Sequence, residues 1–228
     1  MKPDIASLIE QGWDKLKAER QQVNFETGCP EAEDRLNDIE RFPHHFVLAC
    51  IADRQIRANR AWIIPHKIGE ILGSFEFKPL LLLSEEEFTE LFRKEQFHRF
   101  NNRMGSVYFN AVQRIHNAYD DNACAIWCDS KSSPSARIVR RFLEFDGVGV
   151  KIATMATNIL ARDFKVKFKD YSSIDISPDR QVRKFLEHHK LIRPKAKQEE
   201  IIYLARELCP EYPGIIDLVA WEWGRKLR

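Results

Sequence analysis

Hydrophobic residues recur mainly at helical spacing along this chain. The clearest run, Ile152, Met155, Ala156, Ile159 and Leu160, repeats at i, i+3, i+4, i+7 and i+8 and predicts a helix with one apolar face. Comparable repeats predict helices over residues 4–20, 43–62, 84–92, 107–118, 135–145, 182–186, 201–208 and 216–223. Strand-like alternation is confined to residues 165–169, which are too few to found a sheet. The pattern therefore predicts an all-α protein.

Two of the expected helices carry a local start signal. Pro43 suits the first turn of a helix, which we expect to run through Asp53 and on towards Trp62. Ser84 and Glu87 have the spacing of a capping box, in which each side chain binds the backbone N–H group of the other residue.

Composition is that of a soluble globular protein. Of the 228 residues, 44% are hydrophobic and 31% are charged, which suffices for a core and is too apolar for a disordered chain. The longest apolar run, Phe46–Ala52, is far shorter than a membrane span, and the N-terminal residues lack the apolar segment of a signal peptide. We expect a cytoplasmic protein without a membrane partner.

The cysteines and histidines lack the spacing of a metal site. Cys124 and Cys128 lie one helical turn apart, but no second pair accompanies them. The pairs His44–His45 and His188–His189 are adjacent in sequence, so on a helix the two rings of each pair point in different directions. We therefore expect no bound metal and five reduced thiols, those of Cys29, Cys50, Cys124, Cys128 and Cys209.

Positive charge is concentrated in one segment. Residues 134–193 contain thirteen Lys or Arg against seven Asp or Glu, whereas residues 1–42 contain six against ten. A local basic surplus suits a surface that binds a polyanion, although a solvated basic face would give the same count.

The basic segment contains the stretch FDGVGVKIA, residues 145–153, with two of the nine glycines of the chain. We expect Gly147 and Gly149 to adopt positive φ angles in a tight turn between a helix over 135–145 and a helix that starts at Val150. The backbone of Gly147, Val148, Gly149 and Val150 would then offer N–H groups to a phosphate at the positive end of the second helix. Residues 135–162 would thus form a helix-hairpin-helix that binds the DNA backbone; a plain helical corner with a glycine cap is the alternative.

This stretch resembles the LPGVGxKTA hairpin of the helix-hairpin-helix DNA glycosylases, the endonuclease III superfamily of base-excision repair. The resemblance extends over about residues 43–228 and implies two helical lobes with the hairpin at the cleft between them. Residues 1–42 have no counterpart and are expected to form an N-terminal helical extension. Asp146 departs from the family pattern, because it stands where proline is usual and adds a negative charge beside the proposed phosphate site.

The resemblance also implies catalytic residues. Lys151 occupies the place of the amine nucleophile, and the dipole of its helix is expected to lower its pKa. The family's catalytic aspartate, in the pattern VD-x-H-V-x-R, falls on Asp179 within SPDRQVRKF, residues 177–185; the long preceding loop leaves Asp175 as a rival. Each residue also has a structural reading: Lys151 could contact phosphate as a point charge, Asp179 could be a first-turn acid after a cap at Ser177, and Asp175 could close a turn.

Two more distant matches concern DNA and the base. Gln55 in IADRQ resembles a helix-end glutamine that wedges into the base stack in the family, though an exposed glutamine is ordinary at a helix end. Asp217 and Trp221 resemble an Asp and a Trp in the last helix of archaeal 8-oxoguanine glycosylases and are expected in the base pocket. By helical spacing, at least one of Trp221 and Trp223 is expected in the core.

The last helix also bears on cofactors. The family pattern D-x-x-x-W-x-x-G-x-x-x-C ends in a cysteine that begins an iron–sulfur loop, but here Arg228 occupies that position. We expect no cluster and no other cofactor, with room for a structural monovalent or divalent ion at the hairpin.

Three functional hypotheses follow. The first is a DNA glycosylase with AP-lyase activity, in which Lys151 attacks C1′ of a flipped nucleotide bearing a damaged base. The second is a monofunctional glycosylase that uses Asp179 alone, and the third is a non-catalytic helix-hairpin-helix module that binds DNA as a scaffold. The partner expected for the glycosylases is double-stranded DNA with a damaged base, bound by a monomer in the nucleoid.

Overall fold

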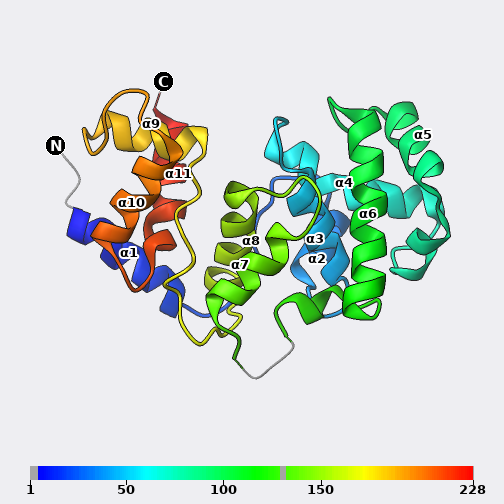
Figure 1. Cartoon of the computed structure of the whole chain (residues 1–228), viewed down its shortest axis with the longest axis horizontal. Helices are drawn as coiled ribbons and strands as arrows, with labels where there is room; N and C mark the ends of the chain where they lie inside the picture. The colour runs from blue at the N-terminus through cyan, green and yellow to red at the C-terminus, as the bar shows by residue number, and fades with distance from the viewer. Residues whose placement is uncertain (1–4, 129–131, 228) are drawn as a thin grey trace. The chain divides into compact units, whose positions relative to one another are not determined.

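The computed structural model describes residues 5–128 and 132–227, and nearly all of its regular structure is helical (Figure 1). The only strand-like pairing in this described part is an isolated bridge between Ser133 and Phe168. The all-α prediction is therefore confirmed. The helices are α1 (Ile5–Lys17), α2 (Pro30–Asn37), α3 (Pro43–Ala52), α4 (Ala58–Leu72), η1 (Lys78–Leu82), α5 (Glu85–Glu95), α6 (Asn101–Tyr119), η2 (Ala123–Ile126), α7 (Ser135–Leu143), α8 (Val150–Arg162), α9 (Arg180–His188), α10 (Gln198–Leu208), η3 (Pro213–Ile216) and α11 (Asp217–Lys226).

The chain divides into two compact units. Unit 1 comprises the described residues of Met1–Gln21, Ser132–Arg140 and Gly149–Arg228, and unit 2 those of Gln22–Lys131 and Arg141–Val148. The first 42 residues are thus shared between the units, with α1 in unit 1 and α2 in unit 2.

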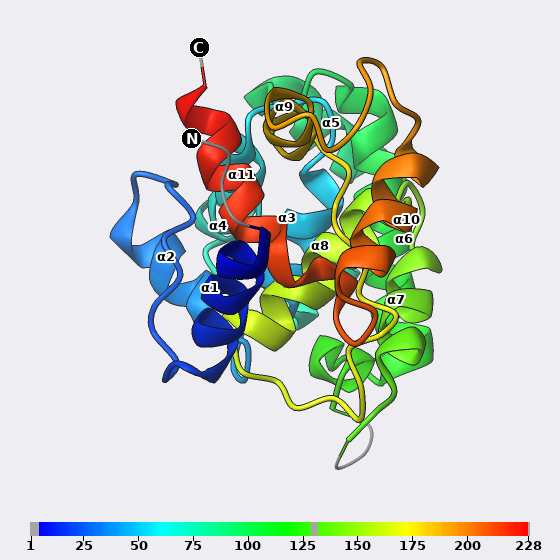
Figure 2. The ribbon, with the colours of Figure 1, turned by 90° about the vertical axis from the view of Figure 1, so that its left-hand side faces the viewer.

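Unit 1 is built around α8, α11 and η3, with α1 packed against all three (Figure 2). Gly12 permits this packing, because a Cβ atom there would lie 2.4 Å from the Ile215 carbonyl oxygen. At the other end of α11, Gly224 lies against the backbone of Gln181 in α9, where a Cβ atom would come within 2.0 Å of the carbonyl oxygen. Both contacts are closer than any side chain allows, so the two glycines fix how α1 and α9 pack in this unit.

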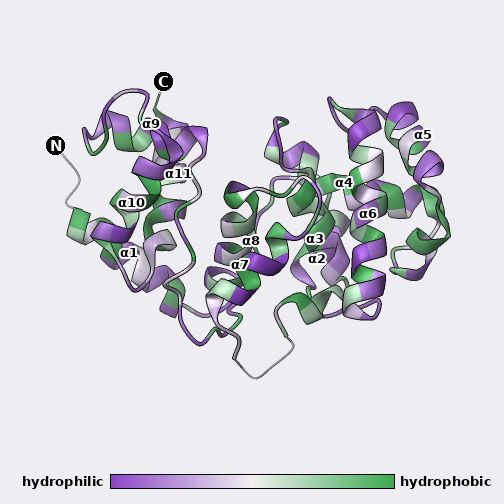
Figure 3. Ribbon diagram, viewed as in Figure 1, coloured by the Kyte–Doolittle hydropathy of each residue, from purple (hydrophilic) through white to green (hydrophobic). Residues whose placement is uncertain are grey.

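Unit 2 has α3 at its centre. All ten residues of α3 are buried, and α2, α4, α6 and η2 pack around it. Most of the surrounding helices alternate hydrophobic and hydrophilic positions (Figure 3). His44 and His45 both place Nε2 within hydrogen-bonding distance of the Phe75 carbonyl oxygen, at 3.1 and 3.2 Å.

Some helix limits differ from the expected ones. The capping box of Ser84 and Glu87 is present at the start of α5, as expected. The helix expected to run from Pro43 towards Trp62 is instead two helices, because α3 ends at Ala52 and Gln55 adopts a left-handed conformation with φ of 56°. None of the described helices is long and apolar enough to cross a membrane.

Candidate functional site

The glycine turn occupies residues 144–149, between α7 and α8. Gly147 has a φ of 78°, a conformation that favours glycine, but Gly149 is extended, with φ of −106° and ψ of −179°. The expectation of positive φ at both glycines is therefore wrong for Gly149, because this residue is the N-cap of α8 and N-cap residues adopt extended conformations. The second helix does begin at Val150.

The two glycines also differ in their surroundings. A Cβ atom on Gly147 would lie 2.6 Å from Nη1 of Arg54, so this position is closed by a guanidinium group. A Cβ atom on Gly149 would meet no atom within 4 Å, and the residue is exposed. Nothing in the described part of the chain therefore requires glycine at 149, whereas the positive φ favours glycine at 147 and a Cβ atom there would displace the Arg54 guanidinium.

Two acids of the turn are held by residues of α6. The Asp146 carboxylate accepts a hydrogen bond of 2.7 Å from Asn110 Nδ2, and Glu144 forms an ion pair with Arg114. The Phe145 ring stacks on Tyr119. These contacts anchor the turn in unit 2, and the bond to Asn110 partly disperses the charge that Asp146 brings in place of proline.

Lys151 is the second residue of α8 and is half-buried. Its carbonyl oxygen accepts a hydrogen bond of 3.3 Å from the hydroxyl of Ser177. The backbone of the proposed nucleophile is thereby joined to the segment that leads into α9.

Asp179 is the N-cap of α9. Its Oδ1 atom accepts hydrogen bonds from the N–H groups of Gln181 and Val182, at 2.7 and 2.8 Å. The alternative in which Ser177 caps this helix is wrong, because the Ser177 hydroxyl binds the Lys151 carbonyl and its N–H group binds Asp217. The cap fixes the orientation of the Asp179 carboxylate.

Asp217 lies beside both predicted catalytic residues. Its side chain is buried, and its Oδ1 accepts the Ser177 N–H group at 3.0 Å. Burial raises the pKa of Asp217 to about 7. The positive charge of Arg162 lowers this pKa, and the negative charge of Asp179 raises it. The Ser177 N–H group and Lys151 have smaller lowering effects. Ser177 binds both Asp217 and the Lys151 carbonyl and stands two residues before Asp179, so unit 1 brings these three predicted residues into one neighbourhood.

The rival acid has a different environment. Asp175 is buried and forms two hydrogen bonds with Arg206, from Nε to Oδ1 at 2.8 Å and from Nη2 to Oδ2 at 2.9 Å. A bidentate pair of this kind occupies both carboxylate oxygens. It gives Asp175 a structural part in unit 1.

The other predicted residues are more exposed. Gln55 is exposed in the turn between α3 and α4 rather than at a helix end. Trp221 is half-buried with the Arg225 guanidinium 4.7 Å from its ring centre, and Trp223 is 44% exposed. The expectation that one of the two tryptophans lies in the core is wrong, because α11 turns its smaller residues Val219, Ala220 and Gly224 inward.

Sequence reasoning missed Asn158 and Tyr212, and it gave Ser177 the role of a helix cap rather than that of a link between Asp217 and Lys151. Asn158 is 1% exposed and makes hydrogen bonds to Tyr212, to the Gly214 carbonyl and to Asp217. A signal was present, because an amide side chain within the apolar face of a helix calls for a buried partner. The partners come from residues more than fifty positions later, and no local pattern identifies them.

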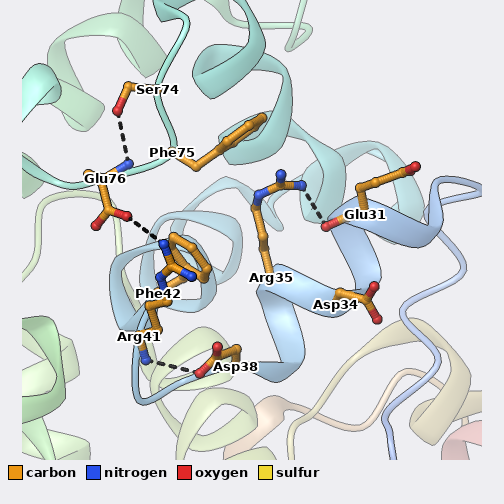
Figure 4. Close-up of a pocket in the computed structure, with 9 residues that line it drawn as sticks. All are labelled: Glu31, Asp34, Arg35, Asp38, Arg41, Phe42, Ser74, Phe75 and Glu76. Atoms are coloured by element: carbon orange, nitrogen blue, oxygen red, sulfur yellow. Dashed lines mark hydrogen bonds and ion pairs between the residues drawn. The ribbon is translucent and has the colours of Figure 1, made fainter.

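A cavity of about 440 Å³ lies in unit 2, lined by residues of α2, residues 41–42 and residues 74–76 (Figure 4). Arg35 stands between Glu31 and the Phe75 ring, with its guanidinium 3.4 Å from the ring centre. None of the residues predicted for catalysis or DNA binding lines this cavity.

The fold of this chain is similar to that of solved helical DNA glycosylase structures. It resembles the 8-oxoguanine glycosylase/lyase of Clostridium acetobutylicum in complex with double-stranded DNA containing cytosine opposite 8-oxoguanine, with a TM-score of 0.61, 17% identity, and coverage of 98% of this chain and 70% of that one. The apo form of that enzyme gives a TM-score of 0.57 at 18% identity, covering 95% of this chain and 75% of that one.

A further solved structure agrees. MBOgg1 in complex with a low-affinity DNA ligand gives a TM-score of 0.61 at 14% identity, covering 98% of this chain and 71% of that one. No family model and no curated protein matches the sequence. The helical fold expected from the hairpin resemblance is therefore confirmed, because these 8-oxoguanine glycosylase structures share it.

Proposed function

We propose that this protein is a base-excision-repair DNA glycosylase with AP-lyase activity, acting on an oxidised base in double-stranded DNA. The observation that carries the proposal is that Ser177 binds both the Asp217 carboxylate and the Lys151 carbonyl, two residues before the capping Asp179 and next to the glycine turn. The fold shared with 8-oxoguanine glycosylase/lyases supports it.

The proposed reaction begins with the neutral amine of Lys151. The amine attacks C1′ of the flipped nucleotide, the bond from C1′ to the base breaks, and the base leaves with the bonding electrons and a proton. Ring opening gives an imine between Lys151 and C1′, and loss of a C2′ proton then expels the 3′ phosphate by β-elimination. The capped carboxylate of Asp179 stabilises positive charge on the sugar and transfers protons. No cofactor takes part.

The glycine turn is proposed to hold the DNA backbone. Gly149 is exposed, leads into the N-terminus of α8 and would place no Cβ between its backbone and a phosphate oxygen. Helix N-termini favour bound anions because their N–H groups are unpaired and their dipole is positive. The exposed side chains of Arg137 and Arg140 on α7 add positive charge to the same stretch of chain.

Two predicted contacts with the bases are retained in the proposal. Gln55 is exposed in a left-handed conformation and would fill the space left by the extruded base. The half-buried ring of Trp221 would stack on that base, with the exposed Trp223 nearby on the same helix.

The two alternative functions differ in what they require of Lys151. In a monofunctional glycosylase, water attacks C1′ and Lys151 only contacts phosphate, as its place in the first turn of α8 also allows. In a non-catalytic scaffold, the same turn binds DNA and no base is released.

Borohydride trapping distinguishes these functions. Wild-type protein would be incubated with duplexes that carry 8-oxoguanine, an oxidised pyrimidine or no lesion, and the imine would be reduced to a stable adduct. We expect an adduct on a lesion duplex that Lys151→Ala abolishes and that Lys67→Ala, at an exposed position of α4, leaves unchanged.

The other possible results of this experiment would support one of the two alternative functions. Base release without an adduct would indicate the monofunctional enzyme. Binding without base release on every lesion would indicate the scaffold and exclude the proposed reaction.

A further inference from the structure

A series of buried hydrogen bonds runs from Tyr212 through Asn158 to Asp217. Tyr212 donates its hydroxyl to Asn158 Oδ1 at 2.5 Å, and Asn158 Nδ2 faces the Gly214 carbonyl at 2.9 Å and Asp217 Oδ2 at 3.4 Å. Because Nδ2 is held by a carbonyl, the amide orientation of Asn158 is fixed and a donor is turned towards Asp217.

Asp217 in turn binds Ser177, which contacts Lys151 and stands close to Asp179 in sequence. Its second oxygen accepts the Ser177 N–H group, and the Ser177 hydroxyl donates to the Lys151 carbonyl. Ser177 stands two residues before Asp179, the N-cap of α9. One buried carboxylate therefore connects the start of α11, the segment before α9 and the first turn of α8.

We propose that Asp217 is a positioning residue, which holds Ser177 so that the amine of Lys151 and the carboxylate of Asp179 face the same sugar carbon. The inference rests on the proposed function. It also changes the role expected for Asp217, because a carboxylate that is 8% exposed and engaged by two protein donors is poorly placed to bind the flipped base.

The ionisation of Asp217 makes the connection sensitive to pH. The charged groups that act on it are Arg162 and Lys151 of α8 and the capping Asp179, and the Tyr212 hydroxyl also interacts with it. Since burial raises its pKa to about 7, the carboxylate is ionised above that pH and protonated below it. The ionised form accepts from Ser177 and Asn158 together, whereas a proton on Oδ2 opposes the Asn158 donor. Positioning is therefore strongest above pH 7.

The test compares single-turnover rates of base release between pH 5.5 and 9. We expect the wild-type rate to fall on the acid side with a midpoint near 7, and Asp217→Asn to lose this limb because the amide does not titrate. Asp217→Ala should lower the rate about 100-fold, the effect of a misplacement of about 1 Å, with less than a twofold change in DNA affinity. Glu222→Gln, at a half-buried acid of the same helix that forms an ion pair of 3.7 Å with Lys15, is the matched control.

A second variant tests the same connection with less risk that the protein fails to fold. Ser177→Ala keeps the N–H group that binds Asp217 and removes only the hydroxyl bond to Lys151. We expect an unchanged melting temperature and a rate between those of wild type and Asp217→Ala. Wild-type rates and pH profiles in both the Asp217→Ala and the Ser177→Ala proteins would overturn the inference.

The Ser177 amide provides a readout that needs no activity. In NMR spectra its resonance should titrate with a midpoint near 7 in wild type and stay fixed in Asp217→Asn. A wild-type amide that does not titrate would overturn the inference even in an active enzyme. If no lesion is processed, the proposed function fails, and this titration alone decides whether Asp217 controls the segment.

Discussion

At the scale of single residues, Asp179 shows how one side chain combines a structural and a proposed chemical role. Its Oδ1 atom caps α9 through two N–H groups, so the carboxylate is fixed before any substrate binds. An asparagine caps a helix about as well as an aspartate but cannot act as an acid or base.

This separation predicts different effects on stability for two substitutions that both lower the rate. Asp179→Asn should leave the melting temperature unchanged and lower the single-turnover rate at least 100-fold, the usual contribution of a general acid–base group. Asp179→Ala should also destabilise the protein by about 1 kcal/mol through the lost cap. Thermal unfolding and quenched-flow assays measure the two effects. Full activity in Asp179→Asn would remove this residue from the mechanism.

The two glycines of the turn give a second residue-scale prediction. Gly147→Ala should destabilise the protein by about 1 kcal/mol or more, because a side chain there has a strained φ and meets Arg54. Gly149→Ala should leave stability unchanged, because its Cβ projects into open space, yet weaken DNA binding by about tenfold by keeping a phosphate from the backbone.

Urea denaturation and fluorescence anisotropy with a labelled duplex measure these two quantities. Equal DNA affinity for wild type and Gly149→Ala would show that the phosphate does not approach at this residue.

The sequence predicted the place of the turn but not this difference between its glycines. The GVG spacing and the flanking periodicity placed a turn before Val150. The glycine with the positive φ, Gly147, is also the one that faces the Arg54 side chain, which comes from the distant turn between α3 and α4. Likewise, the sequence placed Asp179 near the start of a helix but did not show whether Ser177 or Asp179 caps that helix. The structure assigns the cap to Asp179, because Ser177 instead binds Asp217.

At the scale of elements, α3 contains an uncharged pair of histidines. Burial lowers the pKa of His44 to about 4 and that of His45 to about 3. Their unfolded values lie near 6.5, so between these limits the unfolded chain binds more protons than the folded one. Stability conferred by the neutral pair is therefore complete above pH 6.5 and is lost as the pH falls towards 4 and 3.

We accordingly expect the free energy of unfolding of unit 2 to decrease steadily below pH 6.5. Hydrogen exchange at the amides of α3, followed between pH 7.5 and 4.5 and corrected for intrinsic exchange, would measure it. His45→Gln should flatten this dependence, whereas His116→Gln, at an exposed position of α6, should not. Constant protection across the range would show that the pair takes up protons without loss of structure.

At the scale of the whole molecule, local periodicity predicted the helices but not how they are shared between units. No motif marks α1 as a partner of α11, which lies about 200 residues later. Three contacts help to hold helix α1 in unit 1. Gly12 has no Cβ atom and can lie against Ile215, and the Trp13 ring packs against Tyr212. The Lys165 amine donates hydrogen bonds to the carbonyls of Lys15 and Leu16. Such distant contacts leave no spacing in the sequence, so residues 1–42 were expected to behave as one extension.

This discontinuous layout has a consequence for synthesis on the ribosome. Residues 22–131 emerge as a nearly complete unit 2, which lacks only residues 141–148. Helix α1 is translated before α8, η3 and α11, and its set of partners is complete only when η3 and α11 have left the exit tunnel. Until then α1 is a nascent segment whose apolar face is only partly covered, and it reaches its full native contacts about 200 residues after its own synthesis.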